Sequence, residues 1–174
     1  MKIMQTIYAY DVSLFLWVNQ RKSQRFLVRC ARYISKTGDG YLYIALAGIL
    51  SWISDATAML LLSSLTVGFL IERVVYVALK NICRRERPPT ALKIPGFIIP
   101  SDRFSFPSGH TSAAFLVATQ LSFFYPALTF LLLPWAVLVG MARVVLAVHF
   151  PTDTLIGALM GTALAATSLE IVLK

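Results

Sequence analysis

Two histidines and one carboxylate stand at spacings that suit phosphoryl chemistry. The chain has two histidines in all, His110 in FSFPSGHTS and His149 in HFPTD. A neutral imidazole can attack phosphorus as a nucleophile, and a second imidazole can protonate the departing oxygen. Asp153 follows His149 by four residues, with Pro151 suited to a first helical turn. On such a turn the carboxylate would accept from one imidazole nitrogen, fix the tautomer and leave the other nitrogen free to attack.

Cations and a helix-start sequence nearby would suit the phosphate itself. Arg87 and Arg143 offer planar forks that bond two phosphate oxygens at once, and Lys80 offers a compact positive charge. Together they could stabilise the charge of a pentacovalent phosphoryl group. Ser108 is a favoured N-cap type before an apolar stretch, so the next two amides would face an anion at the positive end of the helix dipole. Gly109 has no side chain to obstruct a close approach.

The composition says what kind of scaffold must hold these residues. Of 174 residues, 57% are hydrophobic and 14% charged, and the mean hydropathy is +0.72. The apolar residues form long runs, which is typical of an integral membrane protein and not of a soluble core. The net charge of +8 fits orientation signals, anionic lipid headgroups or an anionic substrate. No nucleic-acid partner is expected, because the basic residues do not gather on a soluble basic face. Cys30 and Cys83 lack metal-ligand spacing.

The apolar runs predict an all-α membrane bundle of about five transmembrane helices. The predicted spans begin at Tyr41 in YLYIALAGILSWIS and then cover residues 56–79, 108–124, 127–148 and 152–172. Before them, the pattern around Arg25–Tyr33 indicates an amphipathic helix lying along the membrane interface. We therefore expect a single membrane domain over residues 1–174, with an interfacial N-terminal helix in 1–37 and a catalytic bundle in 38–174. No cleavable signal peptide is expected.

The order of the spans predicts where the polar breaks lie. Successive spans reverse direction, so the end of the second and the start of the third share one side of the bilayer. The end of the fourth and the start of the fifth return to that side. Three polar breaks, KNICRRERP, FPSGH and ARVVLAVHFPTD, should therefore converge. Glu72 and Arg73 lie inside a span, where ionisable residues normally face the bundle interior.

The three breaks together carry a family signature. Lys80-x6-Arg87-Pro88, then Pro107-Ser108-Gly109-His110, then Arg143-x5-His149-x3-Asp153 resembles the three-part motif of the type 2 phosphatidic acid phosphatase family. Its members are membrane lipid phosphatases with a pocket like that of vanadium haloperoxidases. The resemblance covers about residues 38–172, in order and on one predicted side of the bilayer.

The resemblance implies a role for each matching residue. His149 would be the nucleophile, oriented by Asp153, and would form a phosphohistidine that water hydrolyses. His110 would be the general acid for the leaving alcohol and would then activate water. The phosphate would be held by Lys80, Arg87, Ser108, the Gly109 amide and Arg143. No metal and no other cofactor is implied. The family usually has serine before the third-motif arginine, where this chain has Ala142, which removes one hydroxyl donor.

The resemblance leaves the substrate and its surroundings open. It implies a bacterial envelope lipid: lipid A 1-phosphate, undecaprenyl diphosphate, phosphatidylglycerol phosphate or phosphatidic acid. A phosphotransferase using the same intermediate and a non-catalytic protein that binds anionic lipids are the alternatives. Four further cations could equally be interfacial charges or headgroup contacts: Arg84, Arg85, Lys93 and Arg103.

The resemblance also implies a location. It places the chain in the bacterial inner membrane, with several passes and the active site on the periplasmic side. The distribution of the remaining lysines and arginines favours the cytoplasmic side instead. The membrane bilayer and a lipid phosphate are the expected partners, and the oligomeric state stays open.

Overall fold

The protein is a bundle of helices in a computed structural model that describes residues 2–20, 24–100 and 102–174. Every regular element in those ranges is helical. The elements are α1 (Lys2–Asn19), α2 (Gln24–Lys36), α3 (Gly40–Ile53), α4 (Ala56–Cys83), α5 (Pro88–Leu92), α6 (Gly109–Phe124), the 3-10 turn η1 (Pro126–Leu128), α7 (Thr129–Val145) and α8 (Pro151–Leu173).

The fold is the predicted helical membrane bundle. Among the described residues, three stretches are long and apolar enough to cross a membrane, and these are 56–92, 126–145 and 151–173. The first contains α4, the second η1 and α7, and the third α8. The helices α3 and α6 correspond to the other two predicted spans, and they are shorter, with 14 and 16 residues. These five elements form the multi-pass part of the protein.

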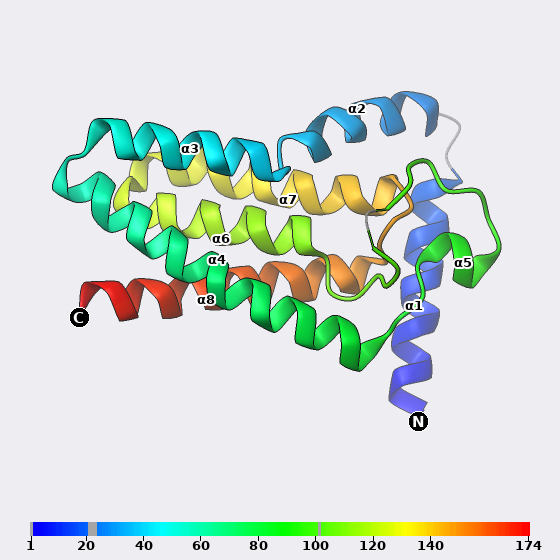
Figure 1. Cartoon of the computed structure of the whole chain (residues 1–174). Helices are drawn as coiled ribbons and strands as arrows, with labels where there is room; N and C mark the ends of the chain where they lie inside the picture. Colours follow the sequence, from blue (N-terminus) through cyan, green and yellow to red (C-terminus); the bar gives the residue numbers. More distant parts are fainter. Residues whose placement is uncertain (1, 21–23, 101) are drawn as a thin grey trace.

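The helix α6 lies at the centre of the bundle, packed against α4, α7 and α8 (Figure 1). Two glycines of α8 allow the close approach of α6. A Cβ at Gly157 would lie 2.6 Å from the carbonyl oxygen of Ser108, and one at Gly161 would lie 2.2 Å from that of Ser112. Small residues spaced by four are a common way to bring membrane helices into backbone contact. The start of α6, with its motif residues, is thereby held against α8.

Two helices precede the bundle. The helix α1 crosses the end of the bundle, and α2 runs along the C-terminal part of α7 (Figure 1). The apolar face of α2 carries Val28 and Ala31, which are buried in a cluster with Ala142 and Leu146. The amphipathic helix predicted around Arg25–Tyr33 is thus α2, and its apolar face meets protein. A position at the membrane interface, and the division of the chain at residue 37, stay predictions.

The polar breaks meet at one end of the molecule, as the alternating topology predicts. The end of α4, the start of α6 and the connection between α7 and α8 all lie at the end opposite the C-terminus (Figure 1). The short helix α5 and helix α1 lie at this same end. The candidate site is built there.

Candidate active site

The long connection between α4 and α6 folds back on itself and brings the first two motifs together. Ser105 is fully buried, and its amide donates to the carbonyl of Arg85 at 2.8 Å. Its hydroxyl donates to the carbonyl of Glu86 at 3.1 Å. These bonds hold FSFPSGH beside the segment that ends in Arg87-Pro88.

The carboxylate of Asp102 gathers two of the predicted phosphate-binding cations. Its Oδ1 accepts from Lys80 Nζ and from Arg87 Nη2, each at 2.5 Å, and its Oδ2 accepts from the Tyr76 hydroxyl at 2.6 Å. Burial alone would raise the pKa of Asp102, but the hydrogen bonds from Lys80, Tyr76 and Arg87 outweigh it and lower the pKa to about 2. An ionised internal carboxylate therefore sits where the sequence predicts a substrate phosphate.

His149, in the third motif, is buried where the charges of Arg87 and Arg143 reach it. Its side chain is 3% exposed, and its Nδ1 lies 3.8 Å from Asp153 Oδ2. That distance exceeds a hydrogen bond, and Nδ1 has no hydrogen-bond partner among the described residues. Burial, opposed by the Asp153 carboxylate and assisted by the positive charges of Arg87 and Arg143, lowers the pKa of the His149 imidazole to about 4. The ring is therefore neutral at physiological pH, as a nucleophile requires.

Asp153 is held by two groups other than His149. Its Oδ2 accepts from the Phe150 amide at 2.8 Å, which caps the start of α8. Its Oδ1 accepts from Arg85 Nη1 at 2.8 Å. The predicted helical turn is present from Pro151 onward, but His149 precedes it. The carboxylate is fixed, and the ring has to move by less than an ångström to bond it.

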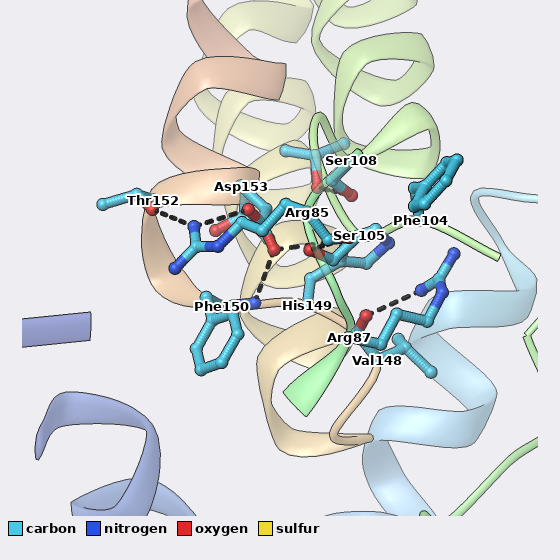
Figure 2. Close-up of polar contacts among 12 residues, drawn as sticks. Arg85, Arg87, Phe104, Ser105, Ser108, Val148, His149, Phe150, Thr152 and Asp153 are labelled. Atoms are coloured by element: carbon cyan, nitrogen blue, oxygen red, sulfur yellow. Dashed lines mark hydrogen bonds and ion pairs between the residues drawn. The ribbon is translucent and has the colours of Figure 1, made fainter. Parts of the chain in front are cut away.

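Arg85 contacts Asp153 and Thr152 at the start of α8 (Figure 2), and it also links them to the N-terminal helix α1. Its Nη2 donates to Asp11 Oδ2 at 2.6 Å, and its Nη1 donates to the Thr152 hydroxyl at 2.8 Å. Asp11 also accepts from the amide of Thr152 at 2.9 Å and from its hydroxyl. The side chains of Asp11 and Asp153 are 1% and 0% exposed. The sequence analysis left two alternatives open for Arg85, an interfacial charge or a contact to a lipid headgroup. In the structure Arg85 instead bridges two buried carboxylates.

On the other side of His149 in the same view, Arg87 reaches the carbonyl of Val148 (Figure 2). Its Nη1 donates to that oxygen at 2.6 Å, and its Nε donates to the carbonyl of Asp102 at 3.1 Å. The arginine therefore joins the first motif to the residue that precedes His149. Both flanks of the His149 backbone are tied to the α4–α6 connection, because Arg85 holds the residues that follow it.

His110 and Arg143 have partners from the N-terminal part of the chain. The Nε2 of His110 lies 2.9 Å from Asp39 Oδ1, in the connection before α3. Arg143 is buried, and its Nη1 donates to the hydroxyl of Ser35 on α2 at 2.7 Å. Ala142 itself packs in the apolar cluster against α2. The hydroxyl beside the third-motif arginine is therefore supplied by Ser35.

The start of α6 has the geometry that the sequence predicts for an anion-binding turn. Ser108 is the N-cap, and the first helical hydrogen bond runs from Ser112 to its carbonyl. The amides of Gly109 and His110 precede that bond, so they are among the free donors of a helix start. The Ser108 hydroxyl is hydrogen-bonded with that of Thr111 at 2.9 Å. A Cβ at Gly109 would lie 2.8 Å from the ring of Tyr76, so only glycine fits beneath that ring.

Two cavities open beside His110. One, of about 780 Å³, is lined by His110, Arg143 and residues of α2. The other, of about 530 Å³, is lined by His110, Lys80 and Asp102. Glu72, which is buried, and Arg73, whose guanidinium lies 5.5 Å from the centre of the Tyr76 ring, line this second cavity. Within the described part of the chain, no group of three metal-ligating side chains is assembled.

Several site residues were missed from the sequence. They are Asp11, Ser35, Asp39, Tyr76 and Asp102, and each contacts a motif residue or its support. A lone acidic residue in an otherwise apolar helix is the one usable signal, because such a residue needs a buried partner. Asp11 fits that description.

This arrangement defines a helical membrane protein with a cationic, histidine-containing site at one end. The sequence pattern of the PAP2 superfamily matches residues 56–174. Decaprenylphosphoryl-5-phosphoribose phosphatase of Mycolicibacterium smegmatis is 34% identical over 134 residues, covering 73% of this chain and 69% of that protein. Undecaprenyl-diphosphatase of Sulfolobus acidocaldarius is 30% identical over 168 residues, covering 93% of this chain and 78% of that protein.

A solved structure of a related protein has the same fold. The crystal structure of Aquifex aeolicus LpxE superimposes with a TM-score of 0.80 at 28% identity, covering 91% of this chain and 94% of that one. The chain therefore belongs to the PAP2 superfamily, the family of type 2 phosphatidic acid phosphatases. It is an enzyme of the phosphatase class.

Proposed function

We propose that the protein releases phosphate from a membrane lipid phosphate, either a phosphomonoester or a pyrophosphate, through a phosphohistidine. The observation that carries the proposal is the meeting of three remote motifs around His149. Its ring lies against Asp153, is kept neutral by burial, and has Arg87 and Arg143 near enough to depress its pKa. Arginine forks beside a neutral nucleophile are what an attack on phosphate needs.

In the first step, His149 Nε2 attacks phosphorus as the bond to the leaving oxygen breaks. The electron pair of that bond goes to the leaving oxygen, which takes a proton from His110. Asp153 accepts a hydrogen bond from Nδ1–H of His149 and stabilises the positive charge that forms on the ring. Asp39 is placed to orient the His110 ring.

In the second step, water replaces the histidine. His110 takes a proton from water as the water oxygen attacks phosphorus, the bond between nitrogen and phosphorus breaks, and inorganic phosphate leaves. The charge on the phosphoryl oxygens would be stabilised by Lys80, Arg87, Arg143 and the start of α6. The substrate phosphate has to replace the Asp102 carboxylate at two of these cations.

The direct test is phosphate release from purified lipid phosphates in the presence of a metal chelator. The panel holds lipid A 1-phosphate, undecaprenyl diphosphate, phosphatidylglycerol phosphate and phosphatidic acid. Wild type should release phosphate and be inhibited by vanadate. His149→Ala should be inactive, and His110→Ala should accumulate labelled phosphoenzyme from a donor with a good leaving group. Wild-type turnover in His149→Ala would exclude His149 as the nucleophile. A new phosphorylated acceptor in place of free phosphate would show a phosphotransferase, and binding that survives loss of both histidines without any turnover would show a lipid-binding protein.

We further propose that the site faces the periplasm of the bacterial inner membrane. Lys80, Arg87 and Arg143 are used by the site, so they should not count as cytoplasmic charges. Cys83 is exposed and ends α4, three residues beyond Lys80, so it reports the side of the site. In a Cys30→Ala variant, a membrane-impermeant maleimide should label Cys83 in intact spheroplasts. Labelling that requires broken membranes would place the site in the cytoplasm.

A further inference from the structure

The larger cavity beside His110 extends from the site to the exposed face of α2. At its inner end lie His110 and Arg143, and its outer wall is formed by α2 with Ile98 and Ile99 of the α4–α6 connection. Its volume of about 780 Å³ is in the range of small-molecule sites. The cavity is therefore large enough for a polar headgroup that continues beyond the reacting phosphate.

Three cations of α2 line this cavity. Arg29, Arg32 and Lys36 are spaced by three and four residues, so they follow one face of the helix, and all three are exposed. Arg29 and Lys36 make no ion pair with any described residue. Arg32 donates to a backbone carbonyl, that of Phe97, at 2.8 Å. No carboxylate in the described ranges is paired with any of these three cations, so this face of α2 presents positive charge.

Among the described residues that line the cavity there is one carboxylate, and it is already engaged. Asp39 lines the wall and is paired with His110. The described part of the lining thus holds four permanent cations, the three of α2 and Arg143, against this single carboxylate. This balance favours an anion in the cavity in addition to the phosphate at His149.

The α2 face is rigidly connected to the site. Val28 and Ala31 anchor α2 on the apolar cluster with Ala142, and Ser35 is hydrogen-bonded to Arg143. Ile99 at the cavity wall is 97% exposed, next to the charged face. Cations on one side of the wall suit an anionic group of a lipid headgroup in addition to its terminal phosphate. The exposed apolar residue on the other side suits the hydrocarbon part of the same lipid.

We propose that the Arg29–Lys36 face of α2 binds a second anionic group of the substrate headgroup. The enzyme would then prefer a lipid diphosphate, or a lipid-linked phosphosugar with its own phosphodiester, over a lipid with a single phosphate. The terminal phosphate would react at His149 and the second anionic group would lie against α2. This inference rests on the proposed phosphatase function and names the substrate class of that site.

The test compares a prenyl diphosphate with the prenyl monophosphate of the same chain length, in one detergent and at one salt concentration. The variant is Arg29→Gln/Lys36→Gln, because neither side chain has an ion pair to lose within the part of the chain that the structure describes. The matched control is Arg25→Gln/Lys93→Gln, which removes the same charge from α2 and the α4–α6 connection outside this cavity. A charge-preserving variant, Arg29→Lys/Lys36→Arg, should keep the preference and shows that α2 tolerates substitution.

We expect wild type to show a kcat/KM at least tenfold higher for the diphosphate. In Arg29→Gln/Lys36→Gln the ratio of the two kcat/KM values should fall by roughly tenfold or more, the size expected for two charge-assisted contacts to phosphate. Turnover of the monophosphate should fall less than threefold, and the control should keep the wild-type ratio.

Three results would overturn the inference and leave the phosphatase function intact. They are a wild type without preference for the diphosphate, an equal loss on both substrates, and a control that loses the preference as well. The last two would mean that α2 acts by general attraction to an anionic surface. A wild type that releases phosphate from neither lipid would refute the proposed function itself.

Discussion

Replacing Arg85 by glutamine should destabilise the protein and slow catalysis, although the first family motif leaves the residue at this position unspecified. Arg85 lies between two carboxylates that are almost fully buried, Asp11 and Asp153, and bonds them at 2.6 and 2.8 Å. Glutamine can keep one hydrogen bond but leaves two buried negative charges without a cation. Removing one partner from a buried ion pair costs about 3–5 kcal/mol. For a chain of this length that is a fall of roughly 6–20 °C in Tm, taking about 2–4 °C per kcal/mol.

The activity of Arg85→Gln should fall together with its stability. Without Arg85, the position and the ionisation of Asp153 are both less favourable for orienting His149. Losses of about 10- to 100-fold are typical when a group that holds a functional side chain is removed. The assay is kcat on the best lipid phosphate at a temperature where wild type and variant are both folded. Arg84→Gln is the matched control, because Arg84 is exposed and its side chain donates a hydrogen bond to the backbone carbonyl of Asn81 and bridges no carboxylates among the described residues.

A double substitution separates the network from a general effect of mutation. Asp11→Asn removes one of the two buried charges, so Arg85→Gln/Asp11→Asn should be more stable than the sum of the single losses predicts. Interaction energies of about 0.5–3 kcal/mol are usual for residues in one network. The reasoning fails if Arg85→Gln keeps the wild-type Tm and kcat, or if the two substitutions are simply additive.

Three further expectations concern the nucleophile, the internal carboxylate and the helix contact. NMR of the imidazole protons should show His149 titrating near pH 4, because burial disfavours the charged ring. The spectrum of His110→Asn lacks the His110 signal and so identifies that of His149, and a His149 midpoint near 6.5 would contradict the prediction. Asp102→Asn should tighten vanadate inhibition about tenfold, since an anion would no longer compete with a carboxylate for Lys80, and an unchanged Ki would mean that Asp102 does not occupy the anion site. Gly161→Ala should lower the Tm by several degrees, because its Cβ would lie 2.2 Å from the carbonyl oxygen of Ser112, and a wild-type Tm would show that α8 moves aside at little cost.

The residues of the candidate site could be predicted from the sequence because their signal is local and chemical. Histidine, arginine and proline at fixed intervals need no knowledge of the fold, and alternating spans are enough to place three breaks on one side. The same pattern predicts the N-cap of α6 at Ser108, which the structure has. The roles assigned to the individual residues stay predictions.

The supporting carboxylates could not be predicted in the same way. Asp11 lies 74 residues before Arg85, and Asp39 lies 71 before His110. No periodicity links residues so far apart, and each pairing depends on how the N-terminal helices fold back on the bundle. Adjacent Arg84 and Arg85 also look alike in sequence. The backbone of Arg84, at φ 46°, turns the chain at the end of α4, and this turn leaves one arginine exposed while the next enters the interior.

The prediction for α2 shows a different limit of sequence reasoning. An amphipathic pattern establishes that one face of a helix is apolar, but it does not say whether lipid or protein covers that face. Here the apolar face covers the end of α7, and Ser35 on it reaches Arg143. A buried hydroxyl costs free energy unless it is hydrogen-bonded. The hydrogen bond between Arg143 and Ser35 therefore stabilises the position of α2 against the site. The cations on the adjacent face of α2 are consequently held along one wall of the cavity, where a substrate headgroup can reach them.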